Sequence, residues 1–250
     1  RRTHRAAMPV GGKPLERLLF RSGSCPRAEA RAAILAGRVT VNGRLLRDPD
    51  QWVDIAHDEV VFDGVPIRPR AREVWLLHKP VGYVTTLDDE HGHDSVAALL
   101  PADRPWLSPV GRLDRDSSGL LLCTNDTHLA AKVLAPAKQL PKVYEVRCKG
   151  PLADAALERL RTGVWLHDRI TLPAQVERLA VDARTSTLRI TLVEGRHRQI
   201  RRMVKAVGSR VHTLHRVRIG PLGLGDLPVG GLRRLDEAEV ALLWAALGGC

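Results

Sequence analysis

The sequence predicts an α+β protein of two unequal domains, and three observations support this prediction. A short N-terminal stretch contains two helical patterns followed by strand patterns. A segment rich in proline and arginine comes next, and the longer remainder mixes strand-like and helix-like runs. Those runs do not alternate as repeated βαβ units would. We therefore expect a mixed, largely antiparallel sheet in the larger domain.

Two helices are expected to open the smaller domain, which we assign to residues 14–64 behind a disordered tail at residues 1–13. The first helix is expected to end at Gly23, and the second to run between Ser24 and Gly37. Each has an apolar face at helical spacing, formed by Leu15, Leu18 and Leu19 in the first and by Ala30, Ala33 and Ile34 in the second.

A small sheet is expected to follow these helices. Val39 and Val41 alternate with polar residues and lead into Asn42-Gly43, a dipeptide typical of a two-residue hairpin turn. Residues 59–64 have the composition of a further strand. The smaller domain is thus predicted to be two helices packed on a short antiparallel sheet.

Arginines are the polar residues left outside the apolar faces of this domain. Arg27 and Arg31 lie one helical turn apart, so they can contact neighbouring phosphates of one nucleic-acid backbone. A solvated helix face explains the same spacing equally well. The whole chain has 39 Lys and Arg against 28 Asp and Glu. Such a balance indicates a polyanionic partner, although an arginine-rich composition alone would also produce it.

The larger domain is assigned to residues 74–250, after a linker at residues 65–73. Its strand-like runs are at 74–78, 119–124, 142–148 and 187–195, and its helix-like runs are at 127–135, 152–163, 196–208 and 236–247. The four cysteines have no C-x-x-C spacing, which argues against a zinc knuckle. No run of about 18 apolar residues occurs. We therefore expect a soluble, cytoplasmic monomer with no membrane partner.

Residues 111–126, GRLDRDSSGLLLCTND, are the first candidate site. Arg112, Asp114, Arg115 and Asp116 lie in a predicted turn directly before an apolar strand. A carboxylate held rigidly at the start of a strand can act as a nucleophile or a base. A surface turn with local ion pairs is the alternative, and for an isolated Asp-x-Asp it is the preferred one.

The helix expected at residues 196–208 is the second candidate site. Its buried stripe follows the i, i+3, i+4, i+7 pattern and consists of Ile200, Met203, Val204 and Val207. Arg198, Lys205, and Arg201 or Arg202 then project from the other side. These cations either form a site or are a solvated basic face.

The smaller domain resembles the S4 RNA-binding domain. The similarity lies in the run LERLLFRSGSCPRAEARAAILAGRVTVNG and in the later DEVVFDG. It implies docking on structured RNA, and binding only. The candidate RNA-binding residues of this domain are Arg17, Arg27, Arg31 and Arg38.

GRLDRDSSGLLLCTND resembles the signature of the RsuA-type pseudouridine synthases, a group that includes the RluB, RluE and RluF types. HKPVGYVTT at 78–86, KVYEV at 142–146, EGRHRQIRRM at 194–203 and LHRVRIGPLGLGDLPVGGLRRL at 214–235 match the same family in order. The resemblance implies a catalytic domain that isomerises a uridine of ribosomal RNA. We expect the large-subunit (23S) RNA as substrate, with the small-subunit (16S) RNA as the alternative.

The resemblance also assigns roles to residues. Asp114 matches the catalytic aspartate, and Arg112 matches the arginine that holds the flipped-out nucleotide. Tyr144 matches the tyrosine that stacks on the target base, although a strand residue of this pattern is equally compatible with the core. Arg201 matches the basic residue that pairs with the aspartate, so we expect a buried Asp114–Arg201 ion pair. Arg198 is a further candidate for RNA contact, and Lys79 is expected to be structural.

The implied reaction exchanges an N-glycosidic bond for a C-glycosidic one. It involves no redox change and imports no group, so no metal or cofactor is expected. The aspartate either attacks the ribose or removes its 2′ proton to give a glycal, and both routes are compatible with the sequence. Reaching the bond in folded RNA requires extrusion of the nucleotide.

Two other functions are compatible with parts of the sequence. DDEHGHD at residues 88–94 clusters histidines and acids that could form a metallohydrolase site. A non-catalytic RNA-binding or ribosome-assembly factor would explain the S4-like domain but not the matches at Asp114, Tyr144 and Arg201.

Overall fold

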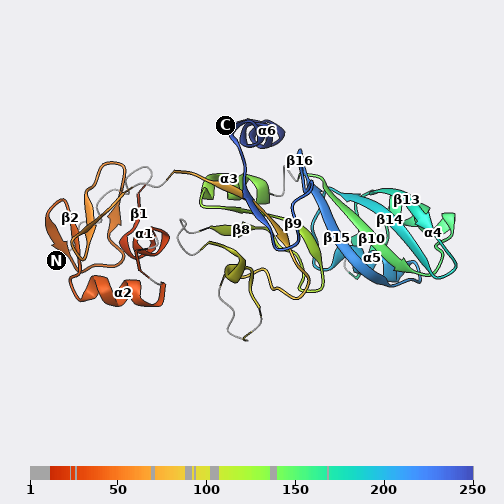
Figure 1. The fold of residues 1–250 in the computed structure, drawn as a ribbon, viewed down its shortest axis with the longest axis horizontal. Coiled ribbons are helices and arrows are strands. Elements are labelled where there is room, and N and C mark those ends of the chain that lie inside the picture. The colour runs from red at the N-terminus through yellow and green to blue at the C-terminus, as the bar shows by residue number, and fades with distance from the viewer. Residues whose placement is uncertain are drawn as a thin grey trace. The chain divides into compact units, whose positions relative to one another are not determined.

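The computed structural model of the chain describes residues 12–22, 24–25, 27–68, 71–87, 92, 94–101, 107–135, 140–167 and 169–249. Helices and strands both contribute to it, which confirms the α+β class (Figure 1). The chain divides into two compact units with a boundary between Arg72 and Glu73, and each is described by itself. Most of the tail expected at residues 1–13 lies outside the described residues. Lys13, however, belongs to a short strand.

The N-terminal unit has the predicted helices and sheet. Helix α1 spans Leu15–Arg21 and α2 spans Arg27–Leu35. An antiparallel sheet has the order β3-β2-β5-β6, formed by Arg44–Leu46, Val39–Val41, Val60–Phe62 and Val65–Ile67. A second small sheet pairs β1 (Lys13–Pro14) with β4 (Trp52–Val53).

The predicted hairpin turn joins β2 and β3. Asn42 has a φ of 52° and Gly43 a φ of 75°, the two positive values that a type I′ turn requires. The apolar faces of both helices pack on the inner side of the sheet, where Leu15, Leu19, Ile34, Val39 and Val60 are fully buried. The sequence pattern therefore predicted the core of this unit, both of its helices and its hairpin.

The linker expected at residues 65–73 begins later than predicted. Val65–Ile67 form strand β6, and Ile67 pairs with Val60 and is buried. Pro66 fits there because β6 is an edge strand, where a missing N–H leaves no ladder bond unmade. The proline and arginine content of the segment concealed this strand.

The C-terminal unit is organised around one mixed sheet. Its main strand order is β13-β14-β10-β15-β9-β7-β17, and β16 and β8 pair with β15 and β9. In that order the seven strands are Gln175–Val181, Thr185–Leu192, Lys142–Lys149, Val211–Ile219, Ser118–Thr124, Val74–Lys79 and Leu232–Arg234. Strand β16 is Leu222–Gly223, and β8 is Ser108–Val110. All pairs are antiparallel except β15–β9, so the predicted mixed, largely antiparallel sheet is confirmed.

Helices cover the two halves of this sheet separately. Helices α4 (Asp154–Thr162) and α5 (Gln199–Ala206) pack on β10, β14 and β15. Helices α3 (Thr127–Leu134) and α6 (Glu237–Ala246) pack on β7, β8 and β9. A 3₁₀ helix, η1 (Val96–Leu99), contributes to a third apolar cluster, and β11 (Trp165–Leu166) and β12 (Arg169–Ile170) form a separate hairpin.

The parallel pairing of β9 with β15 joins the two halves, and we call it the seam. It consists of the pairs His215–Ser118 and Arg216–Gly119. Gly119 has a φ of 110°, and a Cβ built on it would lie 2.2 Å from the carbonyl oxygen of Arg216. Only glycine allows the two backbones to approach so closely.

In the described part of the chain, no helix has both the length and the apolar character needed to cross a bilayer.

Candidate active site

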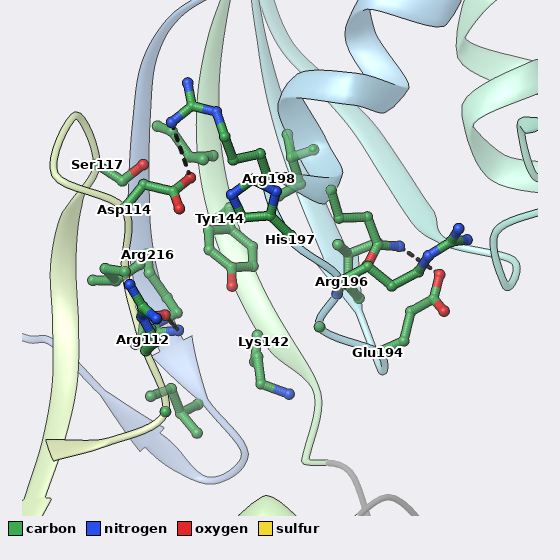
Figure 2. Close-up of a pocket in the computed structure, with 18 of the residues that line it drawn as sticks. Arg112, Asp114, Ser117, Lys142, Tyr144, Glu194, Arg196, His197, Arg198 and Arg216 are labelled. Carbon is green, nitrogen blue, oxygen red and sulfur yellow. Dashed lines mark hydrogen bonds and ion pairs between the residues drawn. The ribbon is translucent and has the colours of Figure 1, made fainter. Parts of the chain in front are cut away.

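A cavity of about 460 Å³ opens beside the seam. Its walls come from the loop between β8 and β9, from β10 and β15, and from residues 194–198 and the start of helix α5. Asp114, Tyr144 and Arg198 line this cavity, as does Arg112 (Figure 2). The structure therefore brings together most of the residues predicted for the site.

The loop that carries Asp114 is held firmly on both sides of the carboxylate. Thr85 Oγ1 donates to the carbonyl oxygen of Leu113 at 2.7 Å and accepts from its N–H at 3.2 Å. After Asp114, the Ser117 N–H donates back to the Asp114 carbonyl oxygen at 3.0 Å and closes a turn. The Asp114 side chain is 28% exposed, so it is fixed in place yet open to the cavity.

Lys79 supports the same loop from beneath, which is the structural role expected of it. Its side chain is fully buried, and Nζ donates to the carbonyl oxygens of Ser117 at 2.8 Å and Pro80 at 2.9 Å. Burial lowers the pKa of Lys79 to about 8, although the negative charges of Asp116 and Asp114 oppose that shift.

The expected ion pair between Asp114 and Arg201 is not the arrangement observed. Arg198 is the cation next to Asp114, with its Nη1 3.6 Å from Oδ2, and it also binds both carboxylate oxygens of Asp116 at 3.1 and 2.8 Å. Arg201 instead donates to the Asp116 carbonyl oxygen at 2.8 Å and to Ser117 Oγ at 3.2 Å. The same nitrogen, Nη2 of Arg201, lies 3.3 Å from Asp116 Oδ2.

Backbone geometry explains this correction. Arg198 precedes the first turn of α5 with a φ of 48° and a ψ of 37°, a left-handed conformation that is uncommon for arginine. Its side chain reaches Asp114 from the rim of the cavity (Figure 2). The helical pattern predicted that these arginines project away from the core, but it does not reveal a left-handed residue.

Asp116 is the more strongly paired carboxylate of the two. Burial alone would raise its pKa, but the hydrogen bonds from Arg198 and the positive charge of Arg201 outweigh burial and lower the pKa. Asp116 therefore anchors the two arginines, whereas Asp114 faces the cavity.

Tyr144 and Arg216 lie together along the cavity wall. The Tyr144 ring is half-buried and packs against the apolar clusters of both halves of the sheet. The guanidinium carbon of Arg216 lies 6.0 Å from the centre of that ring. Tyr144 is thus both a core contact and a cavity residue, and its stacking on a base stays a prediction.

Two basic residues on strands beside the cavity were not predicted as site residues, and neither were Arg196 and His197, which also line it. Arg216 is 3% exposed on β15, and Lys142 lies on β10. Burial, together with the charge of Arg216, lowers the pKa of Lys142. The sequence carried no clear signal for Arg216, because LHRVRIG contains two arginines and only the first of them is buried.

The arginines predicted for RNA binding on the N-terminal unit are partly paired. Arg17 is exposed, Arg31 binds Glu16 at 2.9 Å, and Arg38 binds Asp63 through both carboxylate oxygens. The side chain of Arg27 lies outside the described residues. The ion pairs of Arg31 and Arg38 are solvent-exposed, and such pairs contribute only about 0–1 kcal/mol, so phosphates can compete for these cations.

The metallohydrolase alternative depends on residues 88–94, most of which lie outside the described residues. Among the residues that the structure describes, no group of three or more His, Cys, Asp or Glu side chains could hold a metal ion.

Comparison with known families assigns this architecture to a class of enzyme. The family model for RNA pseudouridylate synthase matches residues 73–206, which include Asp114, Tyr144 and Arg201. The model for the S4 domain matches residues 13–60 of the N-terminal unit. The chain therefore belongs to the RNA pseudouridine synthase family.

Individual relatives are of the RsuA and RluB types. Ribosomal small subunit pseudouridine synthase A of Escherichia coli K12 is 36% identical over 232 residues, which cover 91% of this chain and 98% of that protein. Ribosomal large subunit pseudouridine synthase B of Bacillus subtilis is 33% identical over 233 residues, with coverages of 92% and 95%. A crystal structure of a pseudouridylate synthase matches with a TM-score of 0.65 and 27% identity, over 92% of this chain and 98% of the other.

Proposed function

We propose that this protein converts a specific uridine of structured ribosomal RNA to pseudouridine, with Asp114 as the catalytic carboxylate. The observation that carries this proposal is the position of Asp114, which lines a cavity beside Arg112, Tyr144 and Arg216. Family membership supports the reaction. The names of the two ribosomal relatives support the class of RNA.

The geometry supports a division of roles around the carboxylate. Asp114 either attacks C1′ of the ribose or removes the 2′ proton, and Arg198 supplies a compensating positive charge 3.6 Å away. Tyr144 stacks on the extruded base, which offsets part of the few kcal/mol that unstacking costs. Arg112 is exposed and lines the cavity, where it holds the nucleotide through its phosphate.

The N-terminal unit docks the substrate in this proposal, through the exposed arginines on and after its helices. We take the acting species to be a monomer and the substrate to be the large-subunit RNA, with the small-subunit RNA as the alternative. Mapping pseudouridines on both RNAs from cells with and without the gene distinguishes the two substrates.

Replacement of Asp114 by Asn tests the proposal, because an amide is neither a nucleophile nor a base. We expect Asp114→Asn to abolish tritium release from 5-tritiated uridine in ribosomal RNA, while RNA affinity stays within about threefold because the arginines remain. Asp116→Asn is the matched control, since Asp116 does not line the cavity, although it binds Arg198 and Arg201. It should retain measurable turnover.

Near wild-type turnover by Asp114→Asn would reject Asp114 as the catalytic group. If wild-type protein bound the RNA but released no tritium from either subunit RNA, a non-catalytic RNA-binding function would be supported instead.

A further inference from the structure

Arg216 is a buried cation whose hydrogen-bonding capacity is not fully used. Its Nε donates to the Leu120 carbonyl oxygen at 2.7 Å, and its Nη1 lies 3.5 Å from the Arg112 carbonyl oxygen. Its Nη2 is buried and has no hydrogen-bond partner among the described residues. A buried donor without an acceptor is unfavourable, and it is therefore a candidate for contact with a ligand.

The charges around Arg216 favour an electron-rich ligand. No carboxylate of the described residues forms an ion pair with it, and its positive charge adds to burial in lowering the pKa values of Lys79 and Lys142. Burial is the larger cause in both cases. Arg216 and Lys142 both line the cavity, whereas Lys79 is buried beneath the loop that carries Asp114.

Resting on the proposed function, we propose that Arg216 donates a hydrogen bond to a carbonyl oxygen of the target uracil and neutralises the negative charge that develops there as the N-glycosidic bond breaks. This charge develops in both routes at Asp114, whether the carboxylate attacks the ribose or removes its 2′ proton. When N1–C1′ breaks, its electron pair stays on uracil and is delocalised onto the carbonyl oxygens. C5–C1′ then forms, C5 loses its proton, and N1 gains one, so no other reactant is needed.

Burial distinguishes the uracil from a phosphate as the ligand. The sugar–phosphate backbone continues on both sides of the target nucleotide, so it must stay at the mouth of the cavity. Only the extruded base can reach a guanidinium that is 3% exposed. Arg112, which is exposed, remains available to the phosphate.

The Tyr144 ring supports the same assignment. Its centre lies 6.0 Å from the Arg216 guanidinium carbon, and both side chains line the cavity (Figure 2). A cation at this distance is attracted to the ring and held in place. A base that packs on Tyr144 therefore has a fixed donor near its edge before the bond breaks, which is the arrangement that stabilises developing charge most effectively.

The test compares two leaving groups in single-turnover cleavage of the N-glycosidic bond. An RNA fragment carries either uridine or 5-fluorouridine at the target position, and fluorine makes the departing base a more stable anion. We expect Arg216→Gln to slow cleavage of uridine by about 100-fold or more, as loss of a charge-stabilising donor does elsewhere. The loss on 5-fluorouridine should be at least tenfold smaller, and RNA affinity should change by less than about threefold.

Two further variants control for structure. Arg216→Lys keeps the charge and should be intermediate in rate. Arg218→Gln makes the same substitution two residues along β15, at an exposed position outside the cavity, and should behave as wild type. Thermal unfolding of each variant is measured in parallel. If Arg216→Gln does not fold, the test uses Arg216→Lys instead and compares its losses in cleavage rate on uridine and on 5-fluorouridine.

Equal losses on both substrates, or a loss seen only in RNA affinity, would overturn the role of Arg216. A wild-type protein that formed no pseudouridine would instead refute the proposed function. The two failures are therefore distinguishable.

Discussion

Arg198 and Arg201 reach the same loop from the start of one helix but contact different atoms. Arg198 contacts carboxylate oxygens of Asp114 and Asp116, whereas Arg201 also binds the backbone of Asp116. Arg198 therefore balances charge at the cavity, and Arg201 fixes the position of the loop. A change at either is expected to lower activity, for different physical reasons.

The sequence predicted Asp114, Arg112 and Tyr144 as neighbours of one site because each belongs to a recognisable motif. It did not predict which arginine faces Asp114. Arg198 faces Asp114 because its backbone is left-handed. Its neighbours in the sequence, a histidine and a glutamine, do not predict that conformation. Arg216 was missed as a site residue because its inward orientation follows from the strand register.

Lys79 predicts a pH dependence of stability. Its pKa is about 8 in the folded protein and 10.5 ordinarily, so the unfolded chain binds more protons between these values. Its contribution to stability is therefore lowest below pH 8 and rises as the pH approaches 10.5. The free energy of unfolding of wild type should rise relative to that of Lys79→Met across this range, measured by urea denaturation.

The same substitution at the exposed Lys149 is the control, and its curve should stay parallel to that of wild type. Parallel curves for Lys79→Met as well would show that Lys79 does not titrate in this range.

At the level of elements, β15 is the longest of the strands that the periodicity did not predict. Its buried positions are Val211, Leu214, Arg216 and Ile219, which do not follow the strict alternation of a regular strand. The cause is two shifts of register against β10, each typical of a β-bulge. Strands β7, β9, β10 and β14 were predictable because β7 and β9 are continuous apolar runs and β10 and β14 alternate.

The seam gives a prediction for Gly119. Gly119→Ala places a Cβ against the backbone of Arg216, so we expect a loss of about 3 kcal/mol in the free energy of unfolding and a marked loss of activity. Gly150→Ala is the matched control, because Gly150 also has a positive φ but a Cβ at that position would meet no other atom within 4 Å. It should cost about 1 kcal/mol and leave activity unchanged.

Urea denaturation and tritium release measure the two effects. Equal losses of stability for Gly119→Ala and Gly150→Ala would contradict this prediction. They would show that β9 and β15 do not need to approach each other closely at Gly119.

At the level of the whole molecule, the chain has one unit for the expected RNA docking and one for the expected catalysis. The N-terminal unit carries exposed arginines on an S4-type framework, and the C-terminal unit carries the cavity. The sequence predicted this division because the helical and strand patterns of each unit are self-contained. Only the start of the predicted linker was placed too early, since Val65–Ile67 form an edge strand that contains a proline.

This division predicts how RNA binding depends on salt. A full-length variant with Gln at Arg17, Arg27, Arg31 and Arg38 should bind ribosomal RNA more weakly. Its slope of log affinity against log salt concentration should fall by up to about 0.9 for each phosphate that the variant no longer neutralises. Single-turnover conversion at saturating RNA should change little, because these arginines lie outside the C-terminal unit.

The control carries the same loss of charge on exposed arginines of the C-terminal unit that do not line the cavity, namely Arg147, Arg159, Arg184 and Arg189. An equal decrease in slope for both variants would show that net charge, and not the N-terminal unit, determines docking.

The seam also has a consequence for when the enzyme becomes active during its synthesis. Ser118 and His215, which face each other there, are 97 positions apart in the chain. Contacts of such separation form late, because the intervening chain must first be brought together. A chain on the ribosome can assemble its N-terminal unit and pair β7 with β9 early, but the cavity wall that contains Arg216 exists only after β15 has been made. We therefore expect the nascent protein to bind RNA before it can modify it.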